Sequence, residues 1–383
     1  MDRKNIVKKA FAFIIFICIM AFIIICANRE KPKFTITPTT GTEYETAQVL
    51  EIIEDNTTID SELENVKRGS QELRIKILTG RYKGDTCLVT NYFSAMYSVD
   101  IKENDKVSVR IDTTDENVYS VAIYNYNRIP LFWGLIILFF AVLVIIGGKQ
   151  GLKAFIGLAY TVLCIAFILL PLSLQGFETV PLTCAIIFIT SGACFYLIGG
   201  FQNKTIAAAL GSLCGVLFAA LIGLIASKIG GVTTFQMDEA EALILTKSSF
   251  DIHLRGLFIS SILIAAMGAV MDVAMTIASA LDEVHLLNPE RTFGHLFTSG
   301  MNIGRDAMGT MANTLVLAYV GGALNMMVLI YSYGVSFTQL VNTDFVAIEM
   351  IRAIAGSIGI FLTVPAVSLI SAFLFTRKTT LNS

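Results

Sequence analysis

From residue 131 onward the sequence is dominated by long apolar runs, and this pattern limits the fold more than any other feature. Seven runs approach or exceed the roughly 20 residues that an α-helix needs to cross a bilayer. They lie at residues 131–146, 155–174, 180–198, 205–226, 256–281, 308–333 and 351–375. Charged residues make up only 15% of the chain, whereas a soluble domain contains about 25%. The sequence therefore predicts an α-helical integral membrane protein.

The amino-terminal segment adds another predicted helix. Basic side chains occur in residues 1–10, and an apolar run follows at residues 11–27. A cleaved signal peptide and a retained anchor both fit this pattern, but the residues before Asn28 lack the small side chains that signal peptidase requires. We therefore predict a retained anchor with its basic end in the cytoplasm, and about eight membrane-spanning helices in total.

Residues 28–130 differ from the rest because they are polar and contain no run long enough to span a membrane. Apolar and polar residues alternate there in short segments, which is typical of strands with one buried face. The predicted strands are residues 48–53, 72–78, 86–90, 106–111 and 119–124. We predict a small all-β domain, built as a barrel or a sandwich, between the first and second membrane helices.

The distribution of lysine and arginine predicts the orientation in the membrane. The short loops 175–179 and 334–349 contain neither residue, and the longer loop 227–255 on the same side contains three basic residues against four acidic ones. Further basic residues gather in the loops of the opposite side. Those residues are Lys149, Lys153, Lys204, Arg291, Arg305, Arg377 and Lys378. Because basic loops stay in the cytoplasm, we predict cytoplasmic termini and an extracytoplasmic β domain. The chain would then end in a seven-helix membrane domain at residues 131–375 and a cytoplasmic tail at 376–383.

Composition excludes several functional classes. The formal net charge is -2, so no nucleic-acid partner is expected. Six of the seven cysteines, all except Cys87, lie in apolar runs, where cysteine packs as a small hydrophobic residue. Neither a metal centre nor a nucleotide-binding glycine loop is found, and we expect no cofactor and no enzymatic activity. Asp272 and Asp306 raise the alternative of an aspartyl intramembrane protease, but no protease signature surrounds them.

Polar residues interrupt two of the predicted helices. In the first, small and polar side chains recur at steps of three and four, which places them on one face. They are Ala265, Gly268, Asp272, Thr276, Ser279 and Glu283. Because an intramembrane carboxylate faces protein or water, we predict an ion- or substrate-binding site inside the bundle. Its members are Asp272, Thr276, Asn302, Asp306 and Asn313. The structural alternative is a salt bridge between Asp272 and Arg305 that fixes the helix register.

The segment between these two helices has two interpretations. Hydropathy predicts a cytoplasmic loop of about 26 residues before the helix that starts at Met308, an unusually long link for helices that pack together. Gly300 and Gly304 come shortly before Arg305. This spacing fits an unwound helix start of the kind that forms substrate sites in transporters, and it fits a loop followed by a helix cap equally well.

Two further features concern helix packing. Gly211, Gly215 and Gly223 continue a four-residue repeat with Ala207 and Ala219. Such a ridge of small residues allows close helix approach, either within the bundle or against a second protomer. In the last predicted helix Pro365 removes a backbone hydrogen bond and favours a kink, which is either a gating hinge or a static bend.

Several runs of the sequence resemble the YibE/F-like family of bacterial multi-pass membrane proteins. The longest are GAVMDVAMTIASA at 268–280 and SGMNIGRDAMGTMANTLVLAYVGG at 299–322, and shorter ones are KILTGRYKG at 76–84 and GGKQG at 147–151. The resemblance implies an amino-terminal anchor, an extracytoplasmic β domain and a helical bundle in a bacterial plasma membrane. It supplies no catalytic residues.

Two functions are compatible with these features. The first is a secondary transporter or permease for an ion or small solute, with Pro365 as a hinge. The second is a non-transporting scaffold or sensor that binds partners through its extracytoplasmic domain. The expected surroundings are the lipid bilayer and either a homo-oligomer or a membrane partner subunit. An environment open to water around Asp272 favours transport, and a dry salt bridge to Arg305 favours the second function.

Overall fold

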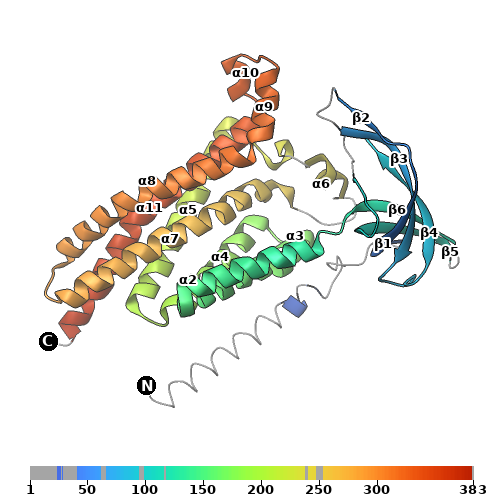
Figure 1. Cartoon of the computed structure of the whole chain (residues 1–383). Helices are drawn as coiled ribbons and strands as arrows, with labels where there is room; N and C mark the ends of the chain where they lie inside the picture. Colours follow the sequence, from blue (N-terminus) through green and yellow to red (C-terminus); the bar gives the residue numbers. More distant parts are fainter. Residues whose placement is uncertain are drawn as a thin grey trace, which may run out of the picture. The chain divides into compact units, whose positions relative to one another are not determined.

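A computed structural model describes residues 24–26, 28, 41–61, 66–94, 99–115, 118–237, 240–246 and 253–381 (Figure 1). The chain divides into two compact units. One is Thr35–Val142, and the other combines Met1–Phe34 with Leu143–Ser383. The predicted anchor at residues 11–27 lies almost entirely outside the described residues.

The first unit contains a six-stranded antiparallel sheet. Its strands are β1 (Thr42–Asp55), β2 (Thr58–Asp60), β3 (Val66–Ile77), β4 (Thr86–Phe93), β5 (Lys106–Asp115) and β6 (Val118–Tyr126). The order is β2-β3-β1-β5-β6, and β4 also pairs with β3. Four of the five predicted strands lie within longer ones, and the fifth, 72–78, extends one residue beyond the end of β3. The three-residue strand β2 is additional, because it is too short to show an alternating pattern.

The sheet curls into a half-barrel, which agrees with a barrel rather than a sandwich. Its buried side is made by alternating apolar residues, such as Leu73, Ile75 and Ile77 on β3. The two outer strands β4 and β6 lie close together, and the Tyr119 hydroxyl of β6 donates to Oδ2 of Asp85, just before β4, at 2.8 Å. This hydrogen bond and the burial of the ring raise the pKa of Tyr119.

A carboxylate at the end of β1 allows the stability of the sheet to be tested as a function of pH. Asp55 accepts hydrogen bonds from the Thr57 hydroxyl at 2.6 Å and from Gln71 Nε2 at 3.0 Å, and these bonds lower the pKa of Asp55. The ionised form therefore stabilises the fold above the unfolded pKa of about 3.9, and this contribution is lost as the pH falls through the lower folded pKa. We expect Asp55→Asn to be less stable than wild type at pH 6, with a difference that shrinks towards pH 2.

Thermal unfolding of the full chain at a series of pH values measures this difference. Glu54→Gln is the matched control, because it removes a neighbouring carboxylate that has no hydrogen bond among the described residues. A constant gap between Asp55→Asn and wild type across the series would contradict the assigned role of the carboxylate.

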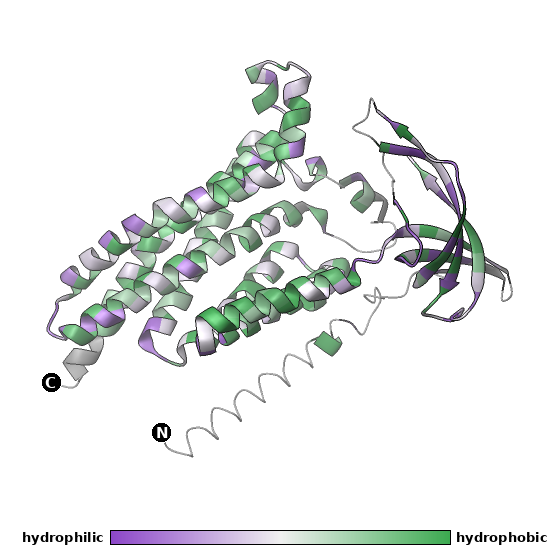
Figure 2. Cartoon of the chain, in the orientation of Figure 1, coloured by the Kyte–Doolittle hydropathy of each residue, from purple (hydrophilic) through white to green (hydrophobic). Residues whose placement is uncertain are grey.

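The second unit is helical. Its α-helices are α2 (Ile129–Cys164, which begins in the first unit), α3 (Leu170–Leu174), α4 (Thr179–Gly199), α5 (Asn203–Gly230), α6 (Ala240–Thr246), α7 (Leu257–Leu287), α8 (Phe293–Gly322), α9 (Leu324–Ser332), α10 (Phe337–Val341) and α11 (Asp344–Leu381). Short helices of other types are η1 (Ile165–Leu169), η2 (Thr234–Gln236) and η3 (Leu254–Gly256). Most residues of these helices are hydrophobic, and hydrophilic residues occur among them along α7 and α8 (Figure 2).

Five helices of the described residues are long and apolar enough to cross a membrane, or up to six if the bent pair α8 and α9 counts as one span. Seven were predicted over the same region. The predicted helices 131–146 and 155–174 both lie in the stretch Ile129–Leu174, whose 46 residues are counted here as a single helix. This stretch consists of two helices that meet at a kink, in agreement with the two helices predicted there. Gly148 kinks this stretch with a φ of 52°, a conformation that glycine adopts without steric strain.

The connection between α7 and α8 corrects the sequence prediction. α7 continues to Leu287 and α8 begins at Phe293, so the predicted loop of about 26 residues is wrong. Arg305 lies inside a continuous helix, and the break comes later, where α8 and α9 meet at an angle of 58°. Hydropathy missed the first half of α8 because polar residues occupy its outer face. The predicted unwound segment at Gly304 is therefore absent from this helix.

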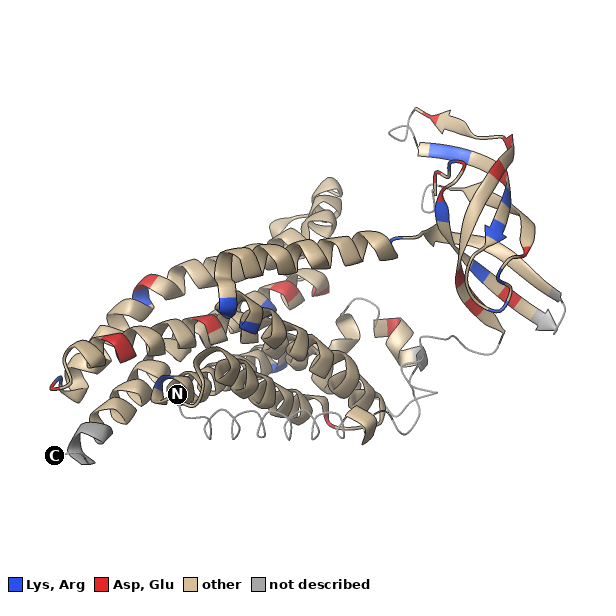
Figure 3. Ribbon diagram, turned by 60° about the horizontal axis from the view of Figure 1, so that its bottom comes forward, with Lys and Arg blue, Asp and Glu red and all other residues tan. Residues whose placement is uncertain are grey.

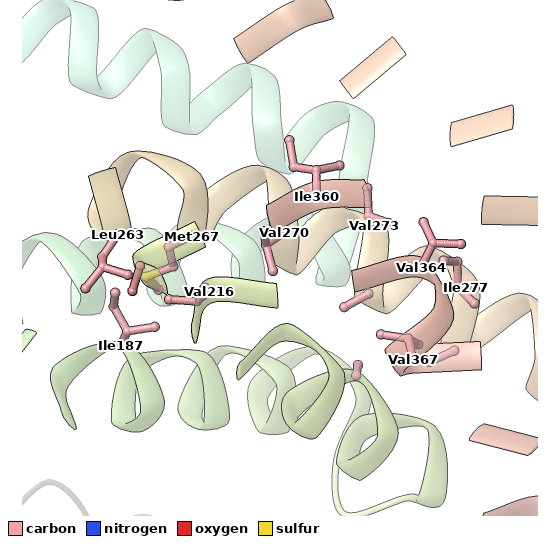
Figure 4. Packing of buried hydrophobic residues seen from close by; sticks show 14 of the residues in the cluster. Ile187, Val216, Leu263, Met267, Val270, Val273, Ile277, Ile360, Val364 and Val367 are labelled. Carbon is pink, nitrogen blue, oxygen red and sulfur yellow. The ribbon is translucent and has the colours of Figure 1, made fainter. Parts of the chain in front are cut away.

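The core of the bundle lies where α5, α7 and α11 pack together, with α4 and α8 beside them (Figure 4). The ridge of small residues on α5 is buried within this bundle. Gly211 lies against Val367, and Gly215 lies against Thr363. Added β-carbons at these glycines would overlap both neighbours, so the ridge is what allows α5 and α11 to approach closely.

Candidate functional site

The polar face of α7 points away from the bundle. Val270, Val273 and Ile277 are fully buried on one side of the helix, whereas Asp272 and Thr276 are exposed on the other. The 3.6-residue period of the helix produces this separation. The sequence correctly placed the small and polar residues on one face, but the face lies outside the bundle rather than inside it.

α8 has the same arrangement. Leu296, Gly300 and Gly304 are buried against α7 and α11. The opposite side of the helix is exposed and carries Asn302, Arg305, Asp306, Gly309 and Asn313. The helix is therefore amphipathic along the segment that hydropathy excluded from the predicted span. We call the exposed residues of α7 and α8, namely Gly268, Asp272, Thr276, Asn302, Arg305, Asp306, Gly309 and Asn313, the polar surface.

The residues that α7 and α8 contribute to the polar surface lie at the same height along the two helices. A β-carbon added to Gly300 would lie 2.9 Å from Cδ1 of Leu281, and one added to Gly304 would lie 3.0 Å from Cδ1 of Ile277. The two helices thus run antiparallel, with residue numbers rising along one as they fall along the other. This register places Asp272 opposite Gly309, and it places Thr276 close to the level of Asp306.

Few direct contacts join these side chains. Arg305 Nη1 donates to Asn302 Oδ1 at 3.4 Å. The salt bridges between described residues do not involve Asp272, Arg305 or Asp306. The alternative in which Arg305 neutralises Asp272 is therefore not present in this structure. Charged residues are sparse along the helices and frequent on the β sheet (Figure 3), so the charges of the polar surface stand out against apolar surroundings.

A second polar cluster was missed by the sequence interpretation. Arg352 of α11 pairs with Glu349 at 2.6 Å, and its guanidinium lies 5.8 Å from the ring centroid of Tyr319 on α8. Arg352 Nε and the Tyr319 hydroxyl are buried without a hydrogen-bond partner among the described residues. The spacing of Glu349 and Arg352, three residues apart in a helix, was the available signal.

The structure also locates the other residues that the sequence singled out. Pro365 lies within α11, which continues as a helix from Asp344 to Leu381. Gly223 of α5 lies against Ile262 of α7. At the other end of α5, Lys204 forms a salt bridge of 3.0 Å with Asp282. Among the described residues no three His, Cys, Asp or Glu side chains are grouped closely enough to hold a metal ion.

Family models match almost the entire described chain. Residues 135–377, which include every helix of the polar surface, match the YibE/F-like protein family. The chain belongs to the YibE/F-like family. Residues 42–126, which are the six strands, match the N-terminal domain of the same family. No curated protein and no solved structure matches this YibE/F-like chain.

The family assignment confirms the resemblance that the sequence runs carried. It identifies the half-barrel and the helical unit as the two parts of one YibE/F-like architecture. Several apolar helices after the β domain indicate a multi-pass membrane protein. The polar surface occupies two of the runs on which the resemblance rests.

Proposed function

We propose that this YibE/F-like protein is a secondary transporter or permease for an ion or small solute in a bacterial plasma membrane. The observation that supports the proposal is the polar surface, where oxygen-bearing side chains of two adjacent helices lie at one level. In our proposal both termini are cytoplasmic and the β domain is extracytoplasmic, in accordance with the distribution of basic residues.

The charges of the polar surface favour a cation or proton. Asp272 and Asp306 supply two negative charges, and Arg305 supplies one positive charge. Thr276, Asn302 and Asn313 add neutral oxygens, which together with carboxylates suit hard cations. Ionisable residues in membrane helices are costly to retain and commonly mark ion pathways. The proposal requires no cofactor and no chemical reaction.

A second function is favoured by the exposure of the same residues. A scaffold or sensor needs a membrane surface on which another protein can dock, and an uncovered polar face on two helices supplies one. In that case the β domain would bind a ligand or partner outside the membrane. Absence of flux distinguishes this function from transport.

Flux measurements on purified protein in vesicles test the proposal. We expect wild-type protein to move at least one of H⁺, Na⁺, K⁺, Mg²⁺ and Ca²⁺ across the vesicle membrane. Asp272→Asn is expected to reduce this flux at least about tenfold, because a lost charge-assisted contact contributes roughly 1.5–3 kcal/mol. Glu290→Gln is the control, since it removes an exposed carboxylate from the connection between α7 and α8.

Two results would count against transport. Wild-type vesicles that carry none of these ions, combined with a membrane protein that co-purifies at a fixed ratio, would support the scaffold. Equal flux in wild type and Asp272→Asn would remove Asp272 from the pathway even if transport itself were observed.

A further inference from the structure

We propose that a second copy of this chain docks on the polar surface of α7 and α8. The proposal concerns assembly alone and does not depend on transport. The polar surface exposes two carboxylates and a guanidinium on helices that are otherwise apolar. Charged groups in contact with lipid tails are strongly disfavoured, so a protein surface is expected to cover them.

Some glycines of the helical unit pack against neighbouring helices, whereas others, including two on the polar surface, face open space. Gly215, Gly300 and Gly304 pack against neighbouring helices, and an added β-carbon would come within about 3 Å of other atoms. Gly268 and Gly309 have no atom within 4 Å of an added β-carbon. Other glycines are open in the same way, among them Gly192 of α4 and Gly294, Gly321 and Gly322 of α8, but Gly268 and Gly309 are the ones that lie on the polar surface. Glycines at a helix surface allow another helix to approach closely, and these two are not used for that purpose within one copy.

An open glycine is not sufficient by itself, as α4 illustrates. Gly192 also has no atom within 4 Å of an added β-carbon. Its neighbours on the helix surface are Phe188 and Ile189, which are exposed and apolar and therefore suited to lipid. Gly309 instead lies between Asp306 and Asn313 on its helix face. The polar surface thus combines close approach with groups that need polar partners.

The chain's own amino-terminal run is a poor occupant. Residues 11–27 contain no charged or amide side chain, so they supply no partner for a carboxylate. A second copy supplies both signs of charge, because Arg305 and Asp306 are successive residues of one face. An interface between identical surfaces is self-complementary when each surface carries both members of its contacts.

Membrane insertion determines which residues meet. Two copies inserted in the same orientation are related by an axis along the membrane normal, so that identical residues lie at the same height. Arg305 of one copy then lies at the height of Asp306 of the other. Gly309, one turn further along α8, lies where the two α8 helices approach each other. Arg305 thereby gains an opposite charge that one copy alone does not place beside it.

Counting copies in lipid bilayers tests the inference. Full-length protein is labelled with a fluorophore and reconstituted in vesicles, and the copies in each particle are counted by stepwise photobleaching. We expect pairs for wild type. Gly309→Leu is expected to raise the dissociation constant of the pair at least about tenfold, since the larger side chain fits one copy and blocks the approach of a second. Gly192→Leu, the matched control on α4, is expected to leave pairing unchanged.

Charge variants test the proposed register. Arg305→Glu is expected to weaken pairing, and the double variant Arg305→Glu/Asp306→Arg is expected to restore it by exchanging the signs. Thermal unfolding of each variant shows whether the single copy remains folded. The proposal would be overturned if wild type were found as single copies, or if Gly309→Leu paired as well as Gly192→Leu. It would also be overturned if the double variant with exchanged charges paired no better than Arg305→Glu. A fixed complex with a different protein in place of a second copy would overturn it as well.

Discussion

Replacing Gly215 by leucine is expected to prevent assembly of the helix bundle. A β-carbon at this position would overlap the Thr363 hydroxyl of α11 and would lie 3.0 Å from the carbonyl oxygen of Gly359. A leucine adds three further carbon atoms to that contact. Inserting atoms into a packed core costs about 1–3 kcal/mol when neighbours can shift. Here one neighbour is helix backbone, so we expect a larger loss and little folded protein.

Size-exclusion chromatography and thermal unfolding in detergent measure this outcome. Gly192→Leu is the matched control, because the same substitution in α4 meets open space. The double variant Gly215→Ala/Thr363→Ala should unfold at a higher temperature than Gly215→Ala alone, since it removes the hydroxyl that the new methyl group meets. Wild-type stability of Gly215→Leu would show that α5 and α11 do not pack through this glycine.

Truncation of Ile75 to alanine is expected to destabilise the β domain by about 2–5 kcal/mol. Ile75 lies on β3, where it pairs with Val49 of β1 and Cys87 of β4, and it is fully buried. The half-barrel has one small core, so a cavity there removes a large part of its apolar contacts. The stability of the helical unit should change little, because its core is separate.

Hydrogen exchange on the full chain distinguishes the two units. Ile75→Ala should lose protection in the strands and keep it in α5, α7 and α11. Leu88→Ala is the matched control, since Leu88 lies one residue along β4 from Cys87 and is 70% exposed. Equal protection of the strands in Ile75→Ala and Leu88→Ala would contradict the assignment of Ile75 to the core.

Much of the architecture was predictable from local patterns. Alternation located five strands of the half-barrel, because each strand exposes one side and buries the other. Length and composition located the apolar helices. The three residues of β2 and the first half of α8 escaped detection, because a short strand has no measurable period and an amphipathic membrane helix has too many polar residues for a hydropathy window.

The sequence did not show which helices contact one another, and the structure was needed for that. The four-residue repeat of Gly211 and Gly215 indicated close packing, but the same repeat would serve an interface between two protomers equally well. Only the positions of Val367 and Thr363 show that α11 is the neighbour. The three-residue spacing of Glu349 and Arg352 could be recognised in the sequence as a possible ion pair. That Tyr319 lies next to this pair depends on how α8 packs against α11.

The sequence by itself determined that Asp272 and Thr276 share one helix face, and that Asp306 and Asn313 share another. The 3.6-residue period is a local property of the chain, so it can be read from residue spacing. Only the tertiary structure decided that both faces point outward and lie at one level. Lipid tails are as apolar as leucine. For that reason hydrophobicity cannot distinguish a side chain in the bundle core from one facing lipid, and the direction of a polar face follows from packing alone.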